Sequence, residues 1–81
     1  MLKLKKSLGQ NLLSDKNIRN KIINSSNITD KKILEIGPGE GFLTDGILEK
    51  KPKKLVLIEK DKIFYYNLIK KYNRLQNVEI Y

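Results

Sequence analysis

The sequence predicts an α/β fold of the Rossmann-like kind, the first βαβαβ half of a parallel sheet. Two observations predict it. Short apolar runs alternate with helix-length segments in the order strand, helix, strand, helix, strand. A turn containing Gly37, Gly39 and Gly41 joins the first apolar run to a helical pattern, which is the layout of a nucleotide-type cofactor site. Right-handed crossovers would place the three strands in the order 3-2-1.

One helix is expected ahead of the sheet, over about residues 15–25. Ser14 is a suitable N-cap, and Asp15 would lie in the first turn, where the helix dipole favours a negative charge. Ser25-Ser26-Asn27 would end the helix. Its apolar residues recur at helical spacing and form one stripe: Ile18, Ile22 and Ile23.

Three strands are expected in the sheet, over about residues 32–36, 54–59 and 77–81. The second is a continuous apolar run, which is typical of a strand buried on both faces of a parallel sheet. The chain ends within the third strand, so the first strand would form an open edge. We therefore expect the front part of a longer protein, marginal in stability by itself.

Two helices are expected between these strands. The first runs from the glycine turn to about Lys50, because Pro52 cannot continue it. Its apolar positions are Leu43, Ile47 and Leu48. The second runs from Asp61 to about Asn73, and its apolar positions are Ile63, Leu68, Ile69 and Tyr72.

The net charge of +8 lies mostly ahead of the glycine turn. Residues 1–32 contain eight Lys/Arg and two Asp, or +6, whereas residues 33–81 contain nine Lys/Arg and seven Asp/Glu, or +2. Residues 1–13 are expected to form a basic N-terminal arm, and residues 14–81 the truncated cofactor domain. Such an arm suits a nucleic-acid backbone. AT-rich coding would produce the same bias toward Lys, Asn and Ile, so charge alone leaves this question open.

The composition excludes several classes of protein. The chain has no cysteine and no histidine, so it lacks disulfides, thiolate metal sites and the commonest general base. No apolar run approaches the roughly 20 residues of a membrane span. The N-terminus also lacks the apolar stretch of a signal peptide. A cytoplasmic protein with no metal and no membrane partner is expected.

The spacing of the glycines selects among cofactors. A dinucleotide fingerprint would need its third glycine at position 42, which is Phe. A P-loop would need Gly-Lys-Ser/Thr, which is absent. The remaining pattern, E-x-G-x-G-x-G, is associated with S-adenosylmethionine (SAM) sites. Bare backbone at Gly37 and Gly39 would let the methionine part and the ribose approach closely. A plain strand-to-helix turn is the alternative.

Two acidic residues are candidates for this site. Glu59 ends the second strand, twenty-two residues after Gly37. An acid at about 20 positions can accept hydrogen bonds from both ribose hydroxyls. The alternative is a solvent-exposed Glu59 paired with Lys60 or Lys62. Glu35 could receive the cofactor's ammonium group or bind the backbone amides of the turn.

Three segments carry a family resemblance. They are Lys-Lys-Ser-Leu-Gly-Gln-Asn-Leu-Leu-Ser-Asp at 5–15, Leu-Glu-Ile-Gly-Pro-Gly-Glu-Gly-Phe-Leu-Thr at 34–44, and Ile-Glu-Lys-Asp at 58–61. Together they resemble the KsgA/RsmA family of SAM-dependent ribosomal RNA adenine N6,N6-dimethyltransferases. The resemblance covers essentially the whole chain, and Leu-Gly-Gln-Asn-x-Leu is its most specific part. The family usually has Phe where this chain has Leu12, which keeps the position apolar.

The resemblance implies cofactor-binding roles for four residues. Asn11 and Leu13 would line the SAM pocket from the N-terminal arm. Gly37 would contact the methionine part, and Glu59 would hold the ribose. Gln10 would stand close by, although an ordinary polar turn is the alternative for this part of the arm.

The resemblance also implies an enzyme that transfers methyl groups from SAM to the exocyclic amine of adenine in small-subunit ribosomal RNA (rRNA), a step of ribosome biogenesis. Lys3, Lys5 and Lys6 would contact RNA phosphates, unless the arm is simply solvated. The family's acidic residue for the cofactor adenine and its Asn-Leu-Pro-Tyr motif for the target base would fall past Tyr81. No catalytic residue is therefore expected in this chain, and residues 1–81 alone should be inactive.

Other functions stay open at this point. An Erm-type methyltransferase, which modifies large-subunit rRNA and confers macrolide resistance, shares the Gln-Asn arm and the glycine turn. Lys-Ser-Leu-Gly before Gln10 favours the KsgA/RsmA type instead. Further alternatives are a mitochondrial transcription-factor relative that binds without catalysis, a small basic RNA-binding module, and a NAD-dependent dehydrogenase half-domain. Phe42 argues against the dehydrogenase.

Overall fold

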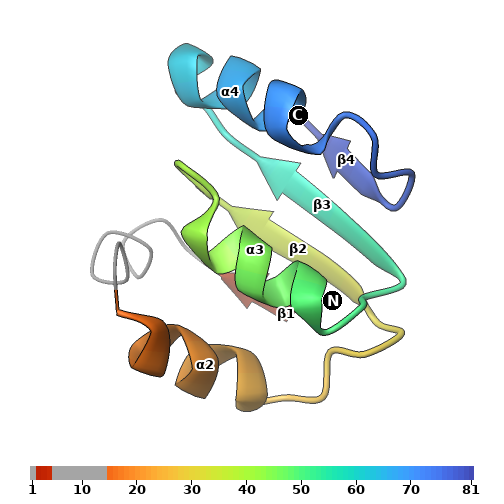
Figure 1. Ribbon diagram of the computed structural model, residues 1–81. Helices are drawn as coiled ribbons and strands as arrows, with labels where there is room; N and C mark the ends of the chain where they lie inside the picture. The colour runs from red at the N-terminus through yellow and green to blue at the C-terminus, as the bar shows by residue number, and fades with distance from the viewer. Residues whose placement is uncertain (1, 5–14) are drawn as a thin grey trace.

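The computed structural model describes residues 2–4 and 15–81. They form three helices and a four-stranded parallel sheet (Figure 1). The predicted α/β class and the parallel sheet are therefore confirmed. In chain order, the elements are β1 (Leu2–Leu4), α2 (Lys16–Asn24), β2 (Lys32–Ile36), α3 (Phe42–Glu49), β3 (Lys54–Ile58), α4 (Lys62–Tyr72) and β4 (Val78–Ile80).

The strands lie in the order β1-β2-β3-β4, and every neighbouring pair is parallel. The predicted order of the last three strands is confirmed. The N-terminal arm differs from the prediction, because residues 2–4 form β1 and pair with β2 from Leu2↔Ile33 to Leu4↔Glu35. The predicted open edge at β2 is thus wrong, since β1 satisfies the backbone groups on that edge.

The core lies on one face of the sheet. Side chains alternate between the two faces of a strand, and alternate residues of β2 and β3 are fully buried. All three helices contribute side chains to one cluster with these residues, so they cover the same face (Figure 1). The buried members are Ile23, Ile28, Ile33, Leu43, Ile47, Leu55, Leu57, Leu68 and Tyr72.

The opposite face of the sheet is more open. Within β3, Val56 is half-buried and Ile58 is 41% exposed. Burial therefore alternates along β3, which is typical of a strand covered on one face. The prediction that this strand is buried on both faces is wrong for the described residues.

Aspartates cap two of the helices. Asp15 is the N-cap of α2, and its carboxylate accepts a hydrogen bond from Ile18 N at 3.1 Å. The prediction of Ser14 as the cap and Asp15 in the first turn is therefore wrong, because Asp15 itself takes the cap position; Ser14 lies outside the described residues. Asp61 caps α4 by accepting from the amides of Ile63 and Phe64 at 2.9 and 3.0 Å. Such caps satisfy backbone donors that have no partner within the helix.

The buried faces of α2 and α4 differ from the predicted stripes. Ile23 is buried, but Ile18 is 42% exposed and Ile63 is 73% exposed. Arg19 is buried in α2 instead. Its guanidinium lies 4.6 Å from the centre of the Phe42 ring and donates to the Phe42 carbonyl at 3.3 Å. A cation–π contact of this kind lets a charged residue occupy a position next to the core.

Candidate cofactor site

The candidate site is built on the turn between β2 and α3. Gly37, Gly39 and Gly41 have φ angles of 70°, 59° and 92°. This left-handed region is costly for residues that carry a Cβ atom. A hydrogen bond from Gly41 N to the Pro38 carbonyl at 3.0 Å closes the turn. The three glycines are therefore required by the backbone, as their spacing suggested.

Gly39 and Gly41 have different surroundings. Among residues 2–4 and 15–81, a Cβ atom at Gly39 would meet no atom within 4 Å, so the described part of the chain leaves space beside this backbone. A Cβ atom at Gly41 would meet the hydroxyl oxygen of Tyr72, at the end of α4. The turn therefore has one glycine with room for a ligand and one glycine packed against a helix.

Glu59 lies directly after β3 and contacts the turn. Its side chain is buried, and its Oε1 accepts from Gly39 N at 2.9 Å. Its Oε2 accepts from Asp61 N at 2.9 Å. In addition, Gly37 N donates to the Ile58 carbonyl at 2.7 Å. The alternative of a solvent-exposed Glu59 is wrong, because the carboxylate joins the turn to the end of β3.

Glu35 is a second buried carboxyl group, two residues before the turn. It is 3% exposed, and its Oε1 accepts from Thr44 Oγ1 at 2.6 Å. Burial raises the pKa of Glu35 to about 7, because it outweighs the Thr44 hydrogen bond and is reinforced by the charges of Asp45 and Glu59. Among the described residues, the hydrogen-bond donor to Glu35 is thus the Thr44 side chain of α3, and not a backbone amide of the glycine turn.

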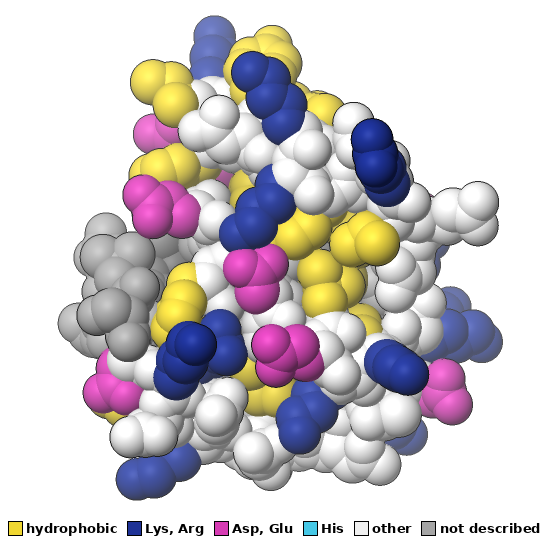
Figure 2. All heavy atoms as spheres, in the orientation of Figure 1, with side chains coloured by type: hydrophobic (Ala, Val, Ile, Leu, Met, Phe, Trp, Pro, Cys, Tyr) yellow, Lys and Arg dark blue, Asp and Glu magenta, His cyan; other side chains and the backbone are white. Residues whose placement is uncertain are grey.

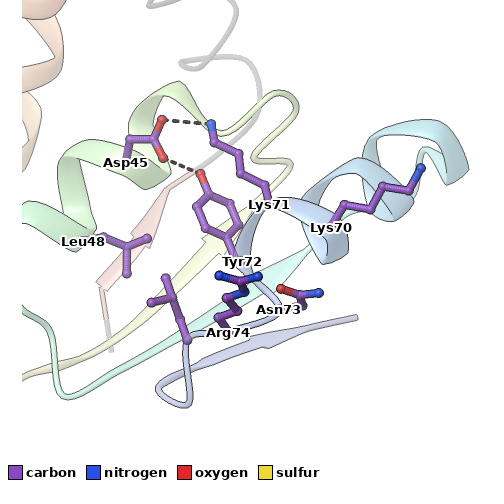
Figure 3. A pocket seen from close by; sticks show the side chains of 8 residues that line it. Asp45, Leu48, Lys70, Lys71, Tyr72, Asn73 and Arg74 are labelled. Carbon is purple, nitrogen blue, oxygen red and sulfur yellow. Dashed lines mark hydrogen bonds and ion pairs between the residues drawn. The ribbon is translucent and has the colours of Figure 1, made fainter.

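The C-terminal end of α4 contacts the turn and the first turn of α3 (Figure 3). Tyr72 Oη donates to Asp45 Oδ1 at 2.6 Å and lies 3.2 Å from the Gly41 carbonyl oxygen. Lys71 Nζ donates to Asp45 Oδ2 at 2.9 Å and to the Glu40 carbonyl at 3.2 Å. Helical periodicity predicted Tyr72 only as an apolar position of its helix. These polar contacts of Tyr72 could not be predicted from the sequence pattern.

A hollow of about 650 Å³ lies beside these contacts, between α3 and α4 (Figure 3). Leu48 and Leu75 line it together with the polar residues Asp45, Lys70, Lys71, Asn73 and Arg74. The glycines of the turn are not among its lining residues. On the face shown in Figure 2, lysine and arginine side chains are interspersed with acidic ones and form no single basic patch.

The structure brings together two of the four predicted cofactor residues. Gly37 and Glu59 meet at the adjacent carboxyl ends of β2 and β3. Lys3 lies in β1. Five further candidates lie outside the described residues: Lys5, Lys6, Gln10, Asn11 and Leu13.

Neither a metal-binding cluster nor a membrane-spanning helix is present in the described part of the chain. In residues 2–4 and 15–81, no three His, Cys, Asp or Glu side chains gather in a way that could hold a metal ion. Within the same part of the chain, no helix has both the length and the apolar character that a membrane span requires.

Comparisons of the sequence with a family model and with known proteins indicate the same family. The family model described as "Ribosomal RNA adenine dimethylase" matches residues 1–81. A ribosomal RNA small subunit methyltransferase A from Pelagibacter ubique is 58% identical over 60 residues. This match covers 74% of the present chain and 23% of the relative.

Solved structures agree with this result. A dimethyladenosine transferase from Plasmodium falciparum superposes with a TM-score of 0.70 and 32% identity, over 80% of this chain and 24% of its own. The 23S rRNA methyltransferase ErmE gives a TM-score of 0.70 and 26% identity, over 83% of this chain and 28% of its own. The chain spans about a quarter of the length of these proteins. The predicted resemblance is confirmed, and the chain belongs to the ribosomal RNA adenine dimethylase family.

Proposed function

We propose that this chain is the SAM-binding, N-terminal part of a small-subunit rRNA adenine N6,N6-dimethyltransferase. The observation that carries the proposal is the junction of the glycine turn with Glu59, through the 2.9 Å hydrogen bond from Gly39 N. In open parallel sheets, ligands bind at the carboxyl ends of the strands, which is where this junction lies. The family and the name of its Pelagibacter relative support the rRNA substrate.

The described residues fit SAM in two ways. No other described residue fills the space beside the Gly39 backbone, and the methionine part and ribose would lie there. A carboxylate has about four acceptor positions, and the amides of Gly39 and Asp61 fix the orientation of Glu59. Ribose hydroxyls would bond to this carboxylate, and Gly37 would contact the methionine part. Asn11 and Leu13 would complete the pocket from the N-terminal arm.

Glu35 would respond to the charge of the cofactor. With a pKa of about 7, it exchanges its proton near neutral pH. A cationic group nearby favours the ionised form of a carboxyl group. The ammonium group of SAM would therefore favour the ionised form of Glu35.

The chain would hold the methyl donor and not the acceptor. SAM, when bound, supplies an electrophilic methyl group on its sulfonium, and the adenine amine must approach in line with it. That step depends on positioning and on electrostatic stabilisation of the charge that develops on the amine. Since the chain spans about a quarter of its relatives' length, the groups that grip the target adenine would lie in the rest of the enzyme, and the arm lysines would contact RNA phosphates. We place the whole enzyme in the cytoplasm.

An Erm-type function is the second candidate. The ErmE structure shares the fold at 26% identity, which keeps large-subunit rRNA as a possible target. The Pelagibacter relative, at 58% identity, is named for the small subunit. Methylation assays on separated small-subunit and large-subunit rRNA distinguish the two targets.

Calorimetry tests the proposal directly. In the complete protein that contains this chain, SAM and its demethylated product S-adenosylhomocysteine (SAH) should bind saturably, and NADH should not bind. Binding of NADH, or a lack of SAM and SAH binding by the folded protein, would contradict the proposal. Residues 1–81 alone, incubated with SAM and rRNA, should incorporate no methyl group. Incorporation would show that acceptor groups lie within this chain.

A further inference from the structure

We infer that Tyr72 is a positioning residue for the cofactor, because its hydroxyl group connects α4 to the glycine turn. Through the Gly41 carbonyl and Asp45, it would hold the turn backbone in the conformation that receives SAM. This inference rests on the proposed function, since it concerns the same cofactor site. Tyr72 itself would not touch the cofactor.

The start of α3 lacks a local cap. Its N-cap residue is Gly41, which makes no side-chain hydrogen bond to the helix. The first backbone bond of the helix joins Asp45 N to the Gly41 carbonyl at 2.8 Å. Tyr72 Oη contacts both of these residues, at the Asp45 carboxylate and at the Gly41 carbonyl. The Tyr72 hydroxyl therefore does not cap the free amides of α3, but it ties the first turn of α3 and the end of the glycine turn to α4.

The packing at Gly41 is close. A Cβ atom at this position would meet Tyr72 Oη and would lie 3.3 Å from Lys71 Nζ. The α4 side chains therefore leave no room for a side chain on Gly41. At Gly39, two residues earlier, no atom of the described residues would lie within 4 Å of a Cβ atom. Within the described part of the chain, the turn is thus supported by α4 at Gly41 and is uncovered at Gly39.

The state of the hydroxyl group suits this role. Tyr72 is 4% exposed. Burial, reinforced by the hydrogen bond to Asp45, raises the pKa of Tyr72 well above its usual range, so the hydroxyl stays a donor. Its bond to the Asp45 carboxylate is charge-assisted and therefore stronger than a neutral one. The Lys71–Asp45 ion pair is more exposed, at 43% for each side chain, and should matter less.

Tyr72→Phe is the informative variant, because it removes only the hydroxyl oxygen and keeps the ring in the core. Tyr66→Phe on the same helix is the matched control, since Tyr66 is 62% exposed. SAH affinity is measured by calorimetry in the complete protein, at a temperature where circular dichroism shows all variants folded. Tyr72→Phe should weaken SAH binding about tenfold, and Tyr66→Phe should leave it unchanged.

Amide hydrogen exchange in the ligand-free protein provides a second measurement. Exchange at Gly41 and Asp45 should be faster in Tyr72→Phe than in Tyr66→Phe. Equal SAH affinity in the two variants, or equal exchange at both amides, would overturn the inference, even if Tyr72→Phe lowers the Tm. A failure of the wild-type protein to bind SAH would instead contradict the proposed function.

Discussion

The two ends of the sheet are built from different residues. Toward the amino ends of the strands, Ile33 and Leu55 lie opposite each other and are fully buried. Toward the carboxyl ends, the same face carries Glu35, and Glu59 follows β3. These two carboxyl groups are 3% and 5% exposed.

This difference separates stability from ligand binding. Burying apolar side chains stabilises the fold, whereas a buried carboxylate costs free energy unless hydrogen bonds or charges compensate it. The described contacts of Glu35 and Glu59 go to Thr44 and to backbone amides near the turn. The apolar core on this face, which also includes Leu57 opposite Glu35, therefore supplies stability, and the carboxyl ends of the strands carry the buried polar groups of the candidate site.

Leu55→Ala should have the largest effect. Leu55 is 0% exposed at the amino half of β3, and such a truncation costs about 2–5 kcal/mol of unfolding free energy. Val56→Ala is the matched control, because the neighbouring Val56 is half-buried on the open face. Urea denaturation of both variants measures the difference. Equal losses would show that the two faces of β3 contribute equally to the core.

Glu35 should make stability depend on pH. Its pKa is about 7 in the folded chain against a reference of 4.5, so the folded state binds more protons between these values. The contribution of Glu35 to the unfolding free energy is therefore most favourable below about pH 4.5. This contribution falls by up to about 3 kcal/mol as the pH rises through 7.

Glu35→Gln should remove this contribution. The test compares unfolding free energies of wild type and variant at a series of pH values. A difference between the two proteins that stays constant from pH 4.5 to pH 8 would show that Glu35 does not titrate in this range.

Glu59→Gln tests whether the carboxylate that follows β3 binds the ribose of the cofactor. Loss of charge-assisted hydrogen bonds should weaken SAH binding about 10-fold to 100-fold. Glu79→Gln serves as the control. Glu79 Oε1 forms an ion pair with Lys54 Nζ at 2.6 Å, both side chains are half-exposed, and neither residue belongs to the turn. Calorimetry of the complete protein measures both. Unchanged affinity in Glu59→Gln would exclude Glu59 as a ribose ligand.

Ile63→Ser should have the smallest effect. Ile63 was predicted as one of the apolar positions of this helix, but it is 73% exposed in the first turn of α4. Its replacement should change the unfolding free energy by less than about 0.5 kcal/mol. A larger loss in urea denaturation would mean that Ile63 is covered in the complete protein.

Local sequence signals predicted much of this protein. The strand at Lys32–Ile36, the ends of the helices near Asn24 and Glu49, and the requirement for glycine at positions 37, 39 and 41 follow from short-range patterns. Each depends on neighbours within a few residues, such as turn chemistry, capping or alternation of apolar residues. The junction of Glu59 with the turn was also predictable, because the carboxyl ends of adjacent parallel strands meet at one edge.

Only the tertiary structure decided the remaining features. It buried Arg19 in place of Ile18, paired residues 2–4 with β2, and left one face of β3 open. It also brought the Tyr72 hydroxyl to Gly41, thirty-one positions earlier in the chain. Such contacts depend on how separate elements pack. Helical periodicity in the sequence indicates which side of a helix is apolar, but it does not indicate which polar atoms of another element that side will contact. The sequence by itself therefore determined the turn and its family, and packing determined what holds the turn in place.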